Sequence, residues 1–139
     1  MVRITSLCVA FFIFISSVAM AQDQTLEKKR SKEIDDFYAA VSFDQPAWIK
    51  ATPAERAKME ADNHAKHEEL ARTNYFAARE LSVHYMRKHT SEGIKRAIEV
   101  VKASKPLAIS AKEKEELEGE EKALGLMYAL ALVKEASKK

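Results

Sequence analysis

The stretch TPAERAKMEADNHAKHEELARTNYFAARELSVHYM, residues 52–86, decides the fold predicted for this chain. It opens on Thr52 as an N-cap, followed by Pro53 at the first helical position and Glu55 at the third, which is the pattern of a capping box. No glycine or proline interrupts the pattern again before about Thr90. The stretch therefore predicts one long second helix, from Thr52 to about Thr90.

The second half of this stretch carries apolar side chains on two sides. One stripe consists of Leu70, Ala77, Ala78, Leu81 and Tyr85. The other consists of Tyr75, Phe76, Val83 and Met86. A helix that is apolar on two sides is usually surrounded by other helices, so we expect this helix to lie at the centre of a bundle.

Three more helices are predicted around it. A first helix runs from about Thr25 to Val41 and ends before Pro46. A short third helix lies within residues 90–106 and is closed by Pro106, and a second capping box at Ser110 opens a fourth helix that runs to about Ala136. The predicted fold class is all-α, a small bundle of about four helices in which the second and fourth pack centrally.

The fourth helix ends in the nearly unbroken apolar run LGLMYALALV, residues 124–133. This run is too short to span a bilayer, which takes about 20 residues. It is apolar around most of its circumference, so we expect it to fill the core beside the second helix. The alternative is a surface groove or a dimer patch.

The N-terminal residues 1–21 have the layout of a secretory signal peptide: Arg3, an apolar run over residues 7–15, and small residues at Ala19 and Ala21. Residues 22–139 then form a single helical domain. The only cysteine, Cys8, lies in the signal peptide, so the exported domain is free of disulfides and the periplasm is a more suitable destination than the extracellular space.

The net charge and the motifs of the sequence limit the classes of function to consider. Removing residues 1–21 takes Arg3 from the 23 basic residues and leaves the 21 acidic ones, a near balance that favours neither nucleic acid nor an anionic membrane as partner. No nucleophile system, haem-attachment motif or glycine-rich phosphate loop occurs. The protein is predicted not to be an enzyme and to have no cofactor other than a metal ion.

The candidate metal site is Glu60, His64 and His67, which fall within about 60° of one another on the second helix. Imidazole and carboxylate groups in this spacing can address zinc, copper or nickel. The alternative is the solvated polar face of a long helix, with Lys66 repelling a cation. Because the helix is predicted to be continuous, His84 and His89 lie about five turns from His64, so the four histidines cannot form one site in a monomer.

The candidate partner-binding residues are Phe43, Trp48 and Ile49, in a predicted loop. Trp48 either covers the end of the bundle or anchors a partner. The predicted function is an exported, non-enzymatic helical binding protein, acting as an inhibitor, a chaperone-like protein or an immunity-type partner of another protein, with a homodimer left open. The alternative function is a periplasmic metal-binding bundle that uses the His/Glu face of the second helix.

Overall fold

The computed structural model describes residues 23–42 and 44–138. By its internal contacts the chain divides into two units, Met1–Lys32 and Glu33–Lys139. The described residues contain helices and no strand, so the predicted all-α class is confirmed. The predicted signal peptide and the candidate partner-binding residue Phe43 lie outside the described residues.

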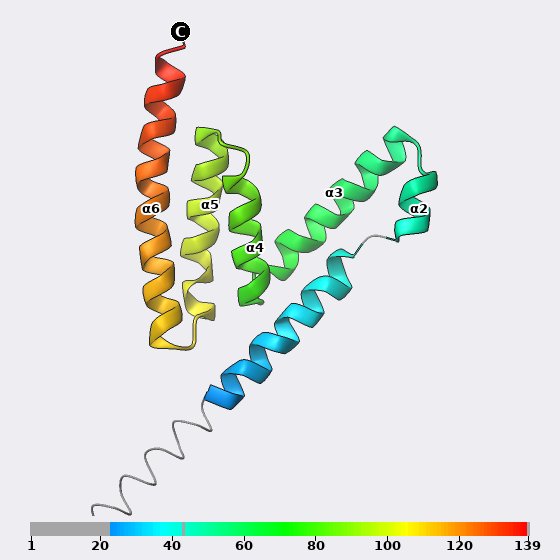
Figure 1. Ribbon diagram of the computed structural model, residues 1–139, viewed down its shortest axis with the longest axis horizontal. Coiled ribbons are helices and arrows are strands. Elements are labelled where there is room, and N and C mark those ends of the chain that lie inside the picture. The colour runs from blue at the N-terminus through cyan, green and yellow to red at the C-terminus, as the bar shows by residue number, and fades with distance from the viewer. Residues whose placement is uncertain (1–22, 43, 139) are drawn as a thin grey trace, which may run out of the picture. The chain divides into compact units, whose positions relative to one another are not determined.

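Residues 23–41 are helical. The elements that follow are shown in Figure 1: α2 (Gln45–Lys50), α3 (Pro53–Leu70), α4 (Tyr75–Met86), α5 (Ser91–Ser104), the short 3-10 helix η1 (Lys105–Leu107) and α6 (Ala111–Ala136). The first, third and fourth predicted helices are confirmed. Both predicted capping boxes, at Thr52 and Ser110, are present.

The prediction of one continuous second helix is wrong, because the chain turns after Leu70 and starts again at Tyr75. Asn74 causes the new start: its side-chain oxygen accepts a hydrogen bond from the backbone N–H of Ala77 at 2.8 Å, as an N-cap does. The Asn74 amide also donates to the backbone oxygen of Glu33 at 2.8 Å. Asn74 is buried. Its side-chain oxygen and its side-chain amide each make a hydrogen bond that stabilises this turn.

The three C-terminal helices form a bundle in which α5 packs against both α4 and α6 (Figure 1). The prediction that the second and fourth helices pack centrally is wrong, since the short third helix takes that place. Gly93 explains how α5 comes so close to α4, because a Cβ added there would lie 2.7 Å from the backbone oxygen of Tyr85. The shared core consists of Tyr75, Leu81, Tyr85, Ile94, Ala97, Val101, Ala108, Leu117 and Leu124.

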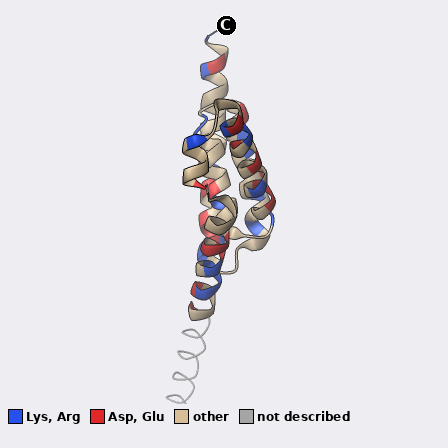
Figure 2. Ribbon diagram, turned by 90° about the vertical axis from the view of Figure 1, so that its right-hand side faces the viewer, with Lys and Arg blue, Asp and Glu red and all other residues tan. Residues whose placement is uncertain are grey.

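A carboxylate ties α6 directly to α4. Glu120 accepts a hydrogen bond from the Ser82 hydroxyl at 2.9 Å and pairs with Arg79 at 2.9 Å. Figure 2 shows Lys and Arg interspersed with Asp and Glu along the described helices. None of the described helices is both long and apolar enough to cross a membrane.

The end of α6 is not surrounded, so the prediction that residues 124–133 fill the core is wrong for most of them. Leu124 is buried, and Met127, Tyr128 and Ala131 are partly buried against the core. Leu126, Leu130 and Val133 are 71%, 70% and 69% exposed. The physical reason is that α6 lies at the edge of the bundle, so that only one of its sides is covered by neighbouring helices.

Candidate functional site

The turn at residues 71–74 brings histidines from two helices together. The ring centres of His64, on α3, and His84, on α4, lie 5.0 Å apart. The predicted separation of about five helical turns between His84 and His64 is therefore wrong, whereas His89 does not line the pocket beside these two rings. The prediction failed because it depended on a continuous helix, in which His84 would lie far from His64.

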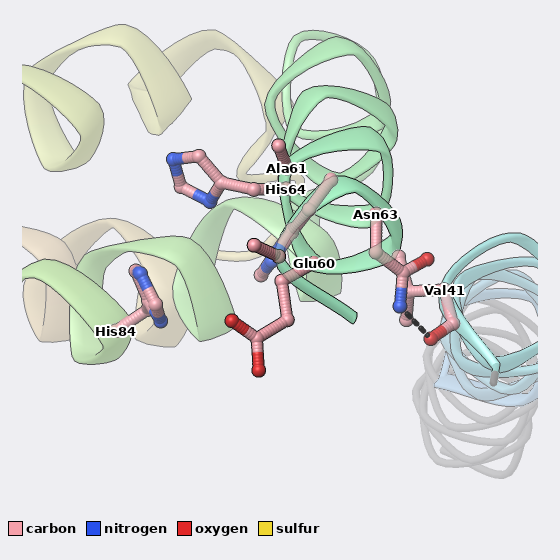
Figure 3. Close-up of a pocket in the computed structure, with 8 residues that line it drawn as sticks. Val41, Glu60, Ala61, Asn63, His64 and His84 are labelled. Atoms are coloured by element: carbon pink, nitrogen blue, oxygen red, sulfur yellow. Dashed lines mark hydrogen bonds between the residues drawn. The ribbon is translucent and has the colours of Figure 1, made fainter. Parts of the chain in front are cut away.

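A pocket of about 720 Å³, open to solvent, lies beside these rings. All three predicted metal ligands, Glu60, His64 and His67, line it together with His84. Figure 3 shows the side chains of Glu60 and His64 on α3 and that of His84 on α4, and it marks the hydrogen bond from the Asn63 amide to the backbone oxygen of Val41, 2.7 Å long. We call this feature the histidine pocket; its full lining is Val41, Ala57, Glu60, Ala61, Asn63, His64, His67 and His84.

Two of the rings are oriented by hydrogen bonds through the same nitrogen. Nε2 of His67 lies 2.8 Å from the backbone oxygen of Ala77. A carbonyl only accepts, so this nitrogen carries the proton and donates. Nε2 of His64 lies within hydrogen-bond distance of the Tyr85 hydroxyl oxygen, at 3.3 Å, and 3.3 Å from a carboxylate oxygen of Glu68; the Tyr85 hydroxyl donates to that same carboxylate. In both histidines this arrangement leaves the lone pair on Nδ1.

The surroundings of His67 and His84 favour their neutral imidazole forms. Burial lowers the pKa of His67, and the neighbouring His64 lowers it further. Burial likewise lowers the pKa of His84, with His64 and Lys88 adding to the effect. The hydrogen bond from Tyr85 lowers the pKa of the Glu68 carboxyl, and this keeps the group that orients His64 ionised. Neutral rings beside an ionised carboxylate are the protonation states that metal binding requires.

The arrangement is not a finished metal centre. Among residues 23–42 and 44–138, no three His, Cys, Asp or Glu side chains stand in positions that could hold one ion without moving. The set of Glu60, His64 and His67 therefore stays a prediction. Sequence reasoning missed His84 as a member of this group. The signal that could have found it is Asn74, an N-cap residue at the start of an apolar stretch.

Of the candidate partner-binding residues, Trp48 and Ile49 lie on α2, so the expectation of a loop is wrong for these two. Arg56 of α3 holds this helix: its guanidinium donates to the backbone oxygens of Trp48 and Ile49 at 3.1 Å each and lies 5.7 Å from the centre of the Trp48 ring. Trp48 is half-buried, whereas Ile49 is exposed. Ile49 is thus the one of the two whose side chain is available to a partner.

A second candidate surface lies on α6. Leu126, Leu130 and Val133 follow the spacing i, i+4, i+7, which places them on one side of the helix. We call these three residues the α6 apolar face. Large apolar side chains that gather in the open on one helix side are typical of a protein interaction site.

Comparison with protein families, with curated proteins and with solved structures finds no significant match for this chain.

Proposed function

We propose that the protein is an exported, non-enzymatic binding protein that recognises a helix of another protein through the α6 apolar face. One observation carries the proposal: Leu126, Leu130 and Val133 are each about 70% exposed on one side of α6. An apolar stripe at this spacing is complementary to the apolar side of an amphipathic helix. The layout of residues 1–21 as a signal peptide supports export.

The charges beside the α6 apolar face favour a different protein over a second copy of this chain. Lys122 and Lys134 are exposed at its two ends and lie about 50° and 70° to its sides at 100° per residue. The nearby carboxylates point elsewhere, since Glu121 binds Lys105 at 2.6 Å and Glu135 accepts from the backbone N–H of Ser91 at 2.9 Å.

Self-association would bring these lysines together. An antiparallel pair of α6 helices that sets Leu126 against Leu130 also sets Lys122 against Lys134. A parallel pair sets each lysine against itself. Like charges across an interface disfavour the pairing, so the partner helix is expected to carry acidic residues at both ends of its apolar stripe.

The experiment uses two designed helical peptides that share one apolar stripe and differ in carrying glutamates or lysines at its ends. Fluorescence anisotropy with the purified protein should show tighter binding of the acidic peptide. The double variant Leu126→Glu, Leu130→Glu should bind neither peptide. The double variant Lys122→Glu, Lys134→Glu should prefer the basic peptide.

Two results would overturn the proposal. One is equal binding of both peptides by the unchanged protein and the charge-reversed variant, which would show that the α6 lysines do not select a partner. The other is a dimer in analytical ultracentrifugation that the Leu126→Glu, Leu130→Glu variant dissolves, which would assign the α6 apolar face to a second copy. Export is tested separately, by fractionating cells and sequencing the N-terminus, which should begin at Gln22.

A further inference from the structure

We propose that His64 and His84 bind one divalent transition-metal ion, zinc, copper or nickel, between α3 and α4, and that Glu60 and His67 complete its ligands. This site is independent of the α6 apolar face, which lies on another helix. It differs from a site on α3 alone because the ion would join two helices. All four side chains line the histidine pocket.

The first support is the spacing of the two rings. A metal–nitrogen bond of about 2.0 Å puts a ring centre about 3.2 Å from the ion, so two imidazoles on one tetrahedral ion have centres about 5 Å apart. The centres of His64 and His84 are 5.0 Å apart. The backbones of α3 and α4 therefore already hold these two rings at the separation that a shared ion needs.

The second support is the set of hydrogen bonds behind the rings. A metal-binding histidine normally donates its other N–H to a carboxylate or a backbone carbonyl, which fixes the ring and its tautomer. His67 has this relation to the carbonyl of Ala77. Behind His64 stand the Tyr85 hydroxyl, 3.3 Å from Nε2, and the Glu68 carboxylate to which that hydroxyl donates. In each case Nδ1 is the nitrogen that remains for the ion.

The basic residue of α3 nearest the two histidines in sequence does not lie at the histidine pocket. Lys66, which lies between the two α3 histidines in sequence, lines a different pocket with Glu69 and Thr73. On α4, Lys88 lies with its ammonium group 5.2 Å from the centre of the Tyr85 ring. Glu60 supplies a carboxylate at the pocket itself. Rotation about the side-chain bonds of Glu60 would add a third ligand, and His67 would add the fourth through Nδ1 while its Nε2 keeps the hydrogen bond to Ala77.

The test is isothermal titration calorimetry of the purified protein with zinc, nickel and copper chloride, one metal at a time. The unchanged protein should bind at least one of them at a single site. His64→Ala and His84→Ala should each weaken that binding by more than about tenfold, and Glu68→Gln, which removes the charge behind His64 and keeps an oxygen for the Tyr85 hydroxyl, by about 10- to 100-fold. His89→Asn is the matched control, because His89 has a φ of 53°, which asparagine tolerates, and it should bind like the unchanged protein.

A second measurement keeps the result independent of folding defects. The metal should raise the thermal midpoint of the unchanged protein and of His89→Asn, and it should leave that of His84→Ala where it is. Binding by His84→Ala as tight as by the unchanged protein would overturn the inference and confine the ion to α3. Equal losses in His84→Ala and His89→Asn, or no saturable binding of any of the three metals, would also overturn it. The Leu126→Glu, Leu130→Glu variant should bind metal normally, so this proposal and the proposed function can fail separately.

Discussion

Leu124 and Leu130 are two leucines of the same α6 segment that the structure places in opposite surroundings. Leu124 is 2% exposed and belongs to the shared core, whereas Leu130 is 70% exposed. Truncating a buried leucine to alanine costs about 2 to 5 kcal/mol, out of the roughly 5 to 15 kcal/mol that stabilise a domain. Leu124→Ala should therefore be strongly destabilising.

The expected cost of Leu130→Ala is much smaller. Full burial of a leucine side chain contributes about 1.5 to 3 kcal/mol, so the three tenths of Leu130 that is covered contributes less than about 1 kcal/mol. For a chain of this size 1 kcal/mol corresponds to a shift of about 3 to 6 °C in the thermal midpoint. Leu124→Ala should lower the midpoint by about 6 to 30 °C and Leu130→Ala by less than about 6 °C.

The assay is thermal unfolding followed by far-UV circular dichroism at two protein concentrations that differ tenfold. Both shifts should be the same at the two concentrations. A loss for Leu130→Ala as large as that for Leu124→Ala would refute the reasoning. If that loss also grew with dilution, Leu130 would be covered by a second copy; if it did not, Leu130 would be packed inside one chain.

Three further changes test other parts of the fold. Asn74→Ala removes a helix cap and a donor to a buried carbonyl, and should lower the free energy of unfolding in urea by about 2 to 4 kcal/mol, whereas Asn74→Ser keeps a capping oxygen and should lose less. Gly93→Ala should destabilise the protein by about 1 to 3 kcal/mol because its Cβ meets a backbone oxygen of α4, and Gly119→Ala, with open space around it, should stabilise it by up to about 1 kcal/mol. The backbone amide and hydroxyl of Thr52 lower the pKa of Glu55 below its ordinary 4.5. The capping box therefore stabilises the protein above pH 4.5, and this contribution is lost as the pH falls through the lowered pKa. Glu55→Gln should show a smaller drop in thermal midpoint between neutral and acid pH.

Local signals were enough to predict most of the helices. The two capping boxes give the starts of α3 and α6, and Pro106 marks the end of the third helix, because each signal acts within one turn of the chain. Asn74 is a capping residue by type, but the bond that favours a turn here over a continuous helix reaches the backbone of Glu33, 41 residues away. No local pattern contains such a partner.

At the candidate site, too, the residues of one helix could be predicted from local spacing, and the residue from the next helix could not. Glu60, His64 and His67 share one side of α3, and helical spacing alone predicts this. His84 joins them only because the chain turns at residues 71–74. On α6 the run of apolar residues predicts a helix, but it does not tell how many sides of that helix are covered, since this depends on the position of α6 in the bundle.

The two hydrogen bonds of the Asn74 side chain affect the order in which the parts of the chain fold. The contacts of α4 with α5 and of α5 with α6 join neighbours in the sequence, and contacts of this kind form quickly. Residues 33–41 are held instead by Asn63 and Asn74, at separations of 22 and 41 residues. Residues 33–41, made before α3 to α6, are therefore expected to dock last, and Phe37, buried in the finished protein, stays open to water or to a chaperone until the turn at Asn74 has closed.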